Sequence, residues 1–407
     1  MAESKVFEPR DFKNIIDYVY QNGERKFTEL EFNVLDNAVL SAFSYIPFEK
    51  FEKTNRDFKE KTLGEICQDY FSWIRLDYLS EHFPDWLRKS VFLAMAMFRS
   101  KRYADVVMTD FCFEFSEEEN TQFGAFNVLL SDGTACTVFR GTDNSILGWR
   151  EDFDLACYDS VKGQISAKNF LNRMMKKYPD RRFRVMGHSK GGNLAVYAAC
   201  FVPKTRIDRI LRIYSNDGPG MNEKVFHSAG HDRIQNRITH IIVEEDIVGR
   251  LLVHERAEYV VLSGPKGNFP MQHDLYNWHV DDISFVKVER ISPESKYLTD
   301  SVNEWLNAAM PDPSIREKLV TAIFEAQGKT GVTEVGTILE NPKKFIVDFL
   351  REINTSEKSE KLLMTKVFLS LIRILIKNRS QYIKDKNDYQ KLKSGNEAKL
   401  LPDKVAA

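Results

Sequence analysis

Three residues at alternate positions, Gly187, Ser189 and Gly191, form the pattern G-x-S-x-G. The apolar residues before it, Phe183 to Met186, are typical of a strand, and those after it, Lys190 to Ala199, are typical of a helix. In a nucleophile elbow, a serine occupies such a strand-to-helix turn, which exposes its hydroxyl. Glycines suit the flanking positions because a Cβ atom would collide where the strand and helix pass one another. The pattern therefore predicts that Ser189 is a nucleophile.

A serine hydroxyl is a weak nucleophile at neutral pH, so it needs an imidazole to accept its proton and a carboxylate to orient that imidazole. After an elbow, these partners follow in the order acid, then histidine, on loops behind later strands. Asp246 follows the predicted strand Ile238 to Val243, and His273 lies in a Gly/Pro-rich loop after the next strand. We therefore expect His273 to be the general base and Asp246 the orienting acid. Asp217 also follows a predicted strand and is the alternative acid.

Other histidines fit the role of the base less well than His273. His188 adjoins the nucleophile, so its side chain must leave the turn in another direction. Five more lie before the acid loop, inside a predicted strand, before the last strand or further along the chain: His227, His231, His240, His254 and His279. Chain order therefore favours His273.

The negative charge that develops during attack on a carbonyl needs hydrogen-bond donors. The backbone N–H of Lys190, directly after the nucleophile, is the first expected donor. The second should come from the end of an earlier strand, which Val138 to Thr142 supplies. Gly141 allows a tight turn there, so that Thr142 can present both its N–H and its hydroxyl.

Strand and helix patterns alternate around these residues. Asp132 and Gly133 form a hairpin-turn signal between predicted strands at 125–130 and 135–139. A helix is predicted from Ser166 to Tyr178, and strands are predicted at 210–214 and 258–262. This order predicts an α/β fold, an α/β-hydrolase core whose mostly parallel sheet carries helices on both faces.

Helical patterns precede and follow this core. The stripe Leu35, Ala38, Val39, Ala42 and Phe43 has helical spacing. We therefore expect three parts: an N-terminal helical segment (1–100) packed on the core, the α/β-hydrolase core (101–285), and a C-terminal helical region (286–407). The polar, Lys-rich residues from Asn378 onward are expected to be frayed or disordered.

Leu362 to Ile376 is the most apolar helical stretch of the C-terminal region. Its few polar residues form one narrow face. An amphipathic helix of this kind could rest on a membrane or a partner. The simpler interpretation is a helix buried on three sides against the core.

Composition narrows the classes of function. The net charge of −1 provides no field that would recruit nucleic acid. The five cysteines are scattered and lack the spacing of a zinc site or a disulfide framework, so we expect neither metal nor cofactor. The first residues are polar and contain no apolar signal-peptide core. A cytoplasmic protein is the expectation.

Several of these motifs together resemble the class 3, fungal-type lipases, and are closest to a bacterial branch of that superfamily. The motifs that carry the resemblance are Phe139-Arg-Gly-Thr142, Trp149 with Asp152, Gly187-His-Ser-Lys-Gly-Gly192, the upstream Phe32 to Leu40 with Tyr45, and His273-Asp-Leu-Tyr-Asn-Trp278. The resemblance spans roughly residues 10 to 285. It implies that Thr142 forms the oxyanion hole, Ser189 is the nucleophile and Asp246 is the triad acid.

The resemblance implies a serine hydrolase of acyl esters or lipids, without a cofactor. Two departures from the family argue against emulsified triglyceride. Lys190 stands where secreted lipases usually carry leucine, and the stretch Leu155 to Ile165 is short and polar for a hydrophobic lid. We therefore expect monomeric acyl esters as substrates. The alternative function is a protein of this fold that binds a lipid or a partner without turnover.

Overall fold

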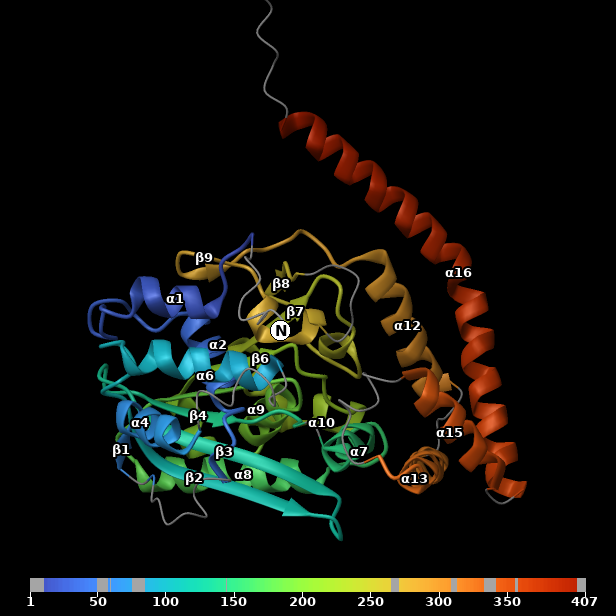
Figure 1. Ribbon diagram of the computed structural model, residues 1–407, viewed down its shortest axis with the longest axis horizontal. Coiled ribbons are helices and arrows are strands. Elements are labelled where there is room, and N and C mark those ends of the chain that lie inside the picture. Colours follow the sequence, from blue (N-terminus) through green and yellow to red (C-terminus); the bar gives the residue numbers. More distant parts are fainter. Residues whose placement is uncertain are drawn as a thin grey trace, which may run out of the picture.

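Eight strands form one sheet in the computed structural model, and they lie side by side in chain order (Figure 1). Pairings from β1 to β4 are antiparallel and those from β4 to β8 are parallel, which confirms the predicted mostly parallel sheet. The strands are β1 (Lys61–Thr62), β2 (Val107–Ser116), β3 (Thr121–Leu129), β4 (Ala135–Phe139), β5 (Phe183–His188), β6 (Ile210–Asn216), β7 (Ile238–Val243) and β8 (Tyr259–Val261). The structure describes residues 11–49, 58, 60–74, 85–143, 145–264, 271–308, 313–332, 342–355 and 358–400.

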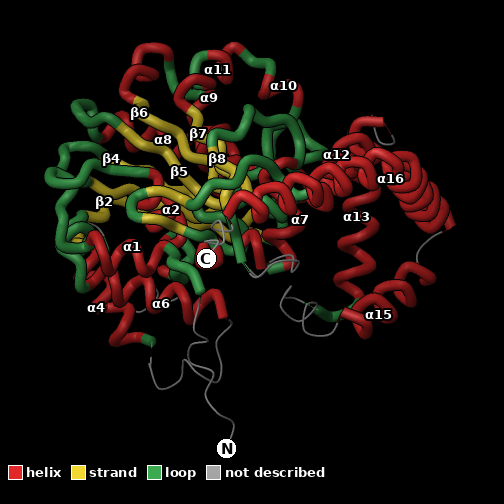
Figure 2. The backbone as a smooth tube through the Cα atoms, turned by 90° about the horizontal axis from the view of Figure 1, so that it is seen from above, coloured by secondary structure: helices red, strands yellow, loops and turns green. Residues whose placement is uncertain are grey.

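Helices cover both faces of this sheet (Figure 2). On one face lie α8 (Lys162–Lys177) and α9 (Lys190–Cys200), with the short α10 (Glu223–Phe226) and α11 (Ala229–Asp232) nearby. The other face is covered by the N-terminal helices α1 (Ile15–Asn22), α2 (Val34–Phe43), α4 (Leu63–Trp73) and α6 (Asp85–Phe98). A small hairpin of β9 (Val280–Asp281) and β10 (Ser284–Phe285) follows the main sheet.

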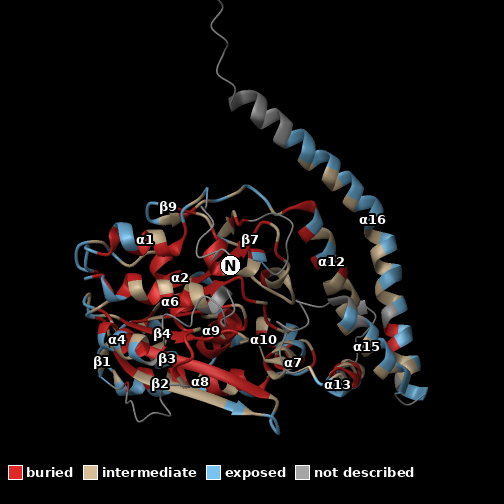
Figure 3. Ribbon diagram, viewed as in Figure 1, coloured by how far each residue is buried: buried red, intermediate tan, exposed pale blue. Residues whose placement is uncertain are grey.

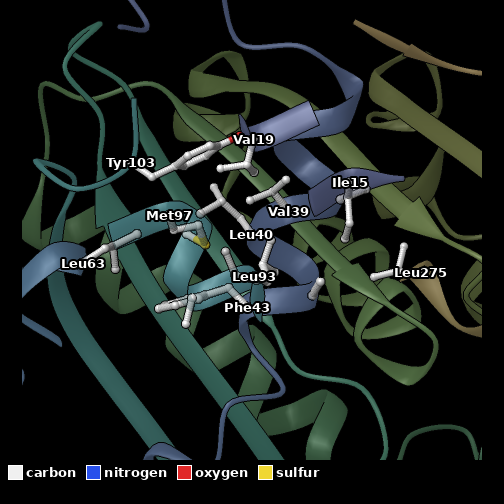
Figure 4. Close-up of a cluster of buried hydrophobic side chains, with 14 of the residues drawn as sticks. Ile15, Val19, Val39, Leu40, Phe43, Leu63, Leu93, Met97, Tyr103 and Leu275 are labelled. Carbon is white, nitrogen blue, oxygen red and sulfur yellow. The ribbon is translucent and has the colours of Figure 1, made fainter. Parts of the chain in front are cut away.

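The N-terminal helices share one hydrophobic core with the sheet. Side chains from α1, α2 and α6, among them Val19, Leu40 and Met97, meet in a single cluster (Figure 4). The stripe predicted on α2 is buried along its whole length. Because side chains alternate along a strand, β4 sends Val138 into this core and Phe139 into the core beneath α8 and α9.

Local sequence signals explain two element boundaries near the site. The β3–β4 hairpin turns at Gly133, whose φ of 81° suits glycine, and the Asp132 side chain accepts a hydrogen bond from the Thr134 N–H at 2.9 Å. α8 begins at Lys162, before the predicted start at Ser166. The Gln164 side chain accepts a hydrogen bond from the Val161 N–H at 3.1 Å and so caps an additional turn.

The C-terminal helices are α12 (Pro293–Ala308), α13 (Pro313–Lys329), α15 (Pro342–Thr355) and α16 (Lys358–Leu400). They share a small core that includes Leu319 and Val367. Two predictions for this region are wrong. The segment Leu362 to Ile376 is not buried on three sides, since Leu362 and Ile376 are 54% and 68% exposed. The residues from Asn378 to Leu400 continue α16, because helical spacing and contacts with α12 extend past the apolar stretch. The rest of that prediction, 401–407, lies outside the described residues.

Every helix in the parts of the chain that the structure describes is too short or too polar to cross a bilayer.

Candidate active site

Ser189 occupies the turn between β5 and α9 with an unusual backbone conformation. Its φ is 56° and its ψ is −132°, a region that residues with a Cβ adopt only at a cost of order 1–3 kcal/mol. A Cβ added at Gly187 would lie 2.3 Å from the carbonyl of Gly191, and one added at Gly191 would lie 2.2 Å from the Phe139 oxygen. Neither position admits a side chain. The strand, turn and helix predicted around Ser189 are therefore all present.

His273, Asp217 and Asp246 form a hydrogen-bonded cluster beyond the carboxyl ends of two neighbouring strands. Asp217 follows β6 and Asp246 lies in the loop after β7, and these strands pair in parallel. Nδ1 of His273 lies 2.7 Å from Oδ2 of Asp217 and 2.9 Å from Oδ2 of Asp246. The side chains of Asp217, Asp246 and His273 are 1%, 0% and 17% exposed. The structure thus brings both candidate acids to one ring nitrogen, where the sequence favoured Asp246 and gave Asp217 as the alternative.

Two carboxylates this close and this buried share a proton more readily than they carry two charges. Burial and the charge of Asp246 raise the pKa of Asp217 well above its ordinary value. Burial opposes ionisation of Asp246, but hydrogen bonds from Asp217 and His273 outweigh it and hold its pKa below the ordinary value. Burial also disfavours charge on His273, yet the two carboxylates raise its pKa from 6.5 to about 10. The favoured arrangement is protonated Asp217 beside ionised Asp246, with a proton on Nδ1 of His273.

His188 supports His273 from the opposite side. Its Nε2 lies 2.8 Å from the backbone oxygen of His273, and its Nδ1 lies 2.8 Å from the Tyr45 hydroxyl. Because a carbonyl only accepts, Nε2 donates and Nδ1 accepts from Tyr45. Burial and the charge of His273 lower the pKa of His188 well below its ordinary value, which keeps the ring neutral. His188 therefore holds the His273 backbone in place. No local sequence signal could pair it with Tyr45, which lies 143 positions away.

Thr142 was expected to offer both its backbone N–H and its hydroxyl to an oxyanion, and its hydroxyl is already bonded. The Thr142 hydroxyl donates to Oδ2 of Asp152 at 2.6 Å, so its single proton is occupied while Asp152 is ionised. Burial raises the pKa of Asp152 from 3.8 to about 6, which still leaves it ionised at neutral pH. The hydroxyl therefore fixes the loop, and the Thr142 backbone N–H is the group available to an oxyanion. At the start of α9 the Lys190 and Gly191 N–H groups precede the first turn's hydrogen bond, which runs from the Gly192 N–H to the Ser189 oxygen at 2.8 Å.

The side chain of Lys190 forms a buried network that the sequence did not predict. Its ammonium is 0% exposed and lies 2.7 Å from a carboxylate oxygen of Glu151, which belongs to α7 (Ile146–Asp154). It also donates to the backbone and side-chain oxygens of Gln122 on β3, at 2.7 Å and 2.9 Å. The other oxygen of Glu151 accepts the Gly163 N–H at 2.8 Å. The residue after Ser189 thus ties the helix that follows Thr142 to the sheet.

The other candidate histidines have partners of their own away from the His273 ring. His240 donates from Nε2 to the backbone oxygen of Gly249 at 2.8 Å and stacks on His254. His231 and His227 pair with Glu255 and Glu223 respectively. His279 stacks on Phe12, with ring centroids 4.0 Å apart. Among the described residues, no hydrogen bond joins the Ser189 hydroxyl to these histidines or to His273, whose ring bonds to Asp217 and Asp246.

Asp217, Asp246 and His273 are also the group of described residues best placed to offer three ligand atoms to a metal ion, because those atoms lie within 4.8 Å of one another. The contacts of Nδ1 at 2.7 Å and 2.9 Å have the length of hydrogen bonds. A proton therefore accounts for the short contacts, and the arrangement suits proton transfer.

A partly open cavity of ≈ 520 Å³ lies elsewhere among the described residues. It is enclosed by the segments 156–159, 221–224 and 252–254 together with residues of α12 and α13. Ser189, Asp217, Asp246 and His273 are not among its lining residues. The segments 221–224 and 252–254 follow the two candidate acids along the chain.

The sheet, the elbow and the helices on both faces define an α/β-hydrolase fold. The model of the Mbeg1-like family matches residues 97–325, more than half of the chain, and the chain belongs to that family.

Solved structures of similar fold include three fungal lipases. Lipase II from Rhizopus niveus is 15% identical, with 62% of this chain and 85% of that chain covered and a TM-score of 0.34. The Rhizomucor miehei lipase propeptide complex is 15% identical, with 72% and 86% covered and a TM-score of 0.35. Lip2 lipase from Yarrowia lipolytica is 16% identical, with 45% and 71% covered and a TM-score of 0.28. At these identities the likeness concerns the fold alone. No curated protein sequence matches the chain.

Proposed function

We propose that the protein is a serine hydrolase of acyl (carboxylic) esters that forms an acyl-enzyme on Ser189. The observation that carries the proposal is the strained elbow at Ser189, whose φ is 56°. Strain of this kind persists where the surrounding structure enforces it, often at a functional site. A reactive fluorophosphonate tests the proposal, because it labels a serine only when a base activates the hydroxyl.

In the proposed mechanism, Nε2 of His273 accepts the Ser189 hydroxyl proton while the oxygen attacks the ester carbonyl. The backbone N–H groups of Lys190 and Thr142 donate to the oxyanion. The imidazolium then protonates the leaving alcohol as the carbon–oxygen bond breaks. A water molecule repeats the sequence on the acyl-enzyme, which releases the carboxylic acid and restores Ser189. Ionised Asp246 stabilises the imidazolium in both steps.

We assign different tasks to the two carboxyl groups at Nδ1 of His273. Asp246 is the ionised acid of the triad, and Asp217 is a protonated neighbour that orients it. The Val248 N–H, which donates to Oδ2 of Asp246 at 3.3 Å, and the lowered pKa of that carboxyl support this division. Because one Nδ1 proton cannot fully serve two acceptors, the proton on Asp217 completes the network.

If the two carboxyl groups have these different tasks, replacing each of them should change the kinetics in a different way. The raised pKa of His273 means that kcat/KM should increase with pH, with a midpoint above 6.5, because only the neutral imidazole accepts a proton. Asp217→Asn removes a group that raises this pKa, so the midpoint should move to lower pH. Asp246→Asn should instead lower kcat by up to about 10⁴-fold. A greater loss of kcat in Asp217→Asn would exchange the two assignments.

We further propose monomeric acyl esters, such as lysolipids or monoacylglycerols, as the substrate class. The support is the fixed position of α7, which follows the Thr142 loop. Glu151 is pinned to Lys190, and Phe153 packs against Phe324 of α13 with ring centroids 5.7 Å apart. Moving α7 would leave Lys190 buried and unpaired, at a cost of about 3–5 kcal/mol. A helix held in this way is unsuited to open as a lid on lipid.

The rate should therefore follow substrate concentration smoothly through the solubility limit of a long-chain ester. We expect a hyperbolic curve on both sides of that limit, measured for esters of increasing chain length. Lys190→Leu provides a comparison, because it releases α7 from the buried ion pair. A sharp rise in rate when micelles or droplets form in the unmodified protein would contradict the assignment.

We retain a cytoplasmic location as a proposal. All five cysteines are free thiols, and four of them are buried. Unpaired thiols are typical of reducing compartments.

A further inference from the structure

A row of exposed apolar side chains runs along α16. Leu362, Leu369, Ile376 and Ile383 recur every seven residues and are 54%, 46%, 68% and 48% exposed, and Ile372 is 38% exposed. At about 100° per residue these five fall within an arc of about 80° and extend along roughly 30 Å of helix. Much of α16 is coloured as exposed in Figure 3. We call these five residues the apolar row.

The opposite side of α16 is fixed to the rest of the C-terminal region. Met364 and Val367 are buried in the small core, and the indole N–H of Trp305 donates to the Val367 backbone oxygen at 3.1 Å. Further along, Tyr382 stacks on Tyr297 of α12 with ring centroids 4.8 Å apart. The helix therefore cannot rotate to bury the apolar row without breaking these contacts.

Cations accompany the apolar row. Between Lys361 and Lys384 the helix contains no Asp or Glu. Lys366, Arg373 and Lys384 lie along one border of the row and Arg379 along the other, at about 100° per residue. None of these four forms an ion pair with a described residue. Acids that α16 contacts are already partnered: Glu304 and Glu294 pair with Lys377 and Lys386, and Glu244 accepts a hydrogen bond from the Tyr389 hydroxyl.

A second copy of the chain is a poor match for this surface. Two such faces brought together would place the same Lys and Arg side chains beside one another. Arg379 would lie in the seam itself, at a position that a coiled coil fills with an apolar residue. An apolar row bordered by unpaired cations instead matches the interface of an anionic bilayer, which accepts apolar side chains and attracts Lys and Arg.

We propose that the outer face of α16 is a docking surface for anionic membranes. The protein's net charge of −1 does not attract such a membrane, so binding depends on this local surface. The inference goes beyond the proposed hydrolysis, and binding does not require a reactive serine.

Co-sedimentation of the full-length protein with vesicles tests the proposal. Binding is expected to vesicles of phosphatidylcholine and phosphatidylglycerol in equal parts, to be weaker in high salt, and to be absent with phosphatidylcholine alone. Arg373→Glu with Lys384→Glu should reduce partitioning by at least about 25-fold, since each lost cation costs about fivefold. Leu369→Ser with Ile376→Ser should reduce it by at least about tenfold.

Matched variants separate this surface from general effects. Lys176→Glu with Lys204→Glu alters the net charge equally at exposed positions elsewhere, and Leu392→Ser removes an exposed leucine of α16 outside the row. Both should bind as the unmodified protein does. Ser189→Ala should also bind normally, which distinguishes failed docking from failed catalysis. The proposal is overturned if the unmodified protein does not bind anionic vesicles. It is also overturned if the matched variants lose as much binding as the variants of the apolar row and its cations.

Discussion

Ser189→Ala should abolish both fluorophosphonate labelling and hydrolysis of a short p-nitrophenyl ester, with kcat falling on the order of 10⁶-fold. The loss is this large because the hydroxyl is the atom that forms the acyl bond, and no other group can replace it. The fold should be retained, since alanine fills the same turn with one atom fewer. The measurement is single-turnover labelling together with steady-state kinetics on the purified protein.

Two further variants sharpen this test. Ser189→Gly should be equally inactive but more resistant to unfolding, because glycine adopts a φ of 56° without strain. The gain in the free energy of unfolding should be about 1 kcal/mol. Ser131→Ala, at an exposed position in the β3–β4 turn, should retain full activity. If Ser189→Ala still turned over ester at the original rate, Ser189 would not be the nucleophile.

His273→Gln should lower kcat by about 10⁴- to 10⁶-fold, because the Ser189 hydroxyl loses its proton acceptor. Glutamine is chosen because its amide N–H can still donate to the carboxylates of Asp217 and Asp246, which avoids leaving them buried without a donor. The residual rate should lose the pH dependence assigned to the imidazole. Rates across the pH range, with thermal unfolding as a check on folding, measure both effects.

His279→Gln is the matched control for this experiment. His279 lies on the same stretch of chain but stacks on Phe12, so its replacement should leave kcat and its pH profile unchanged. Added imidazole should partly restore activity to His273→Ala, because the vacated space faces the same carboxylates. Equal losses in His273→Gln and His279→Gln would assign the effect to the loop as a whole rather than to a base at His273.

Features that depend on neighbouring residues were predictable from the sequence. The elbow is such a feature, because the turn at Ser189 leaves no space for a Cβ atom at Gly187 or Gly191. The β3–β4 hairpin is another, since Asp132 and Gly133 form its turn. The mostly parallel sheet followed from the alternation of strand and helix patterns. The chemistry expected at the turn, serine hydrolysis, remains a proposal.

Features that depend on distant partners were decided only by the tertiary structure. Sequence order could not rank Asp217 against Asp246 with certainty. Both acids reach His273 because β6 and β7 are adjacent and end at the same edge of the sheet. The partners of Lys190 are equally remote, since Gln122 and Glu151 precede it by 68 and 39 positions.

The sequence by itself determined where the strand-to-helix turn at Ser189 lies, because the constraints on that turn are steric and local. The tertiary structure decided which side chains surround that serine and which surfaces meet solvent. α16 illustrates the difference: the same apolar spacing is compatible with a buried helix or an exposed one. Its exposed row follows from Trp305 and Tyr297 holding the opposite side of the helix, which its own residues could not reveal. Burial is a property of contacts between segments, and those contacts form only when the whole chain has folded.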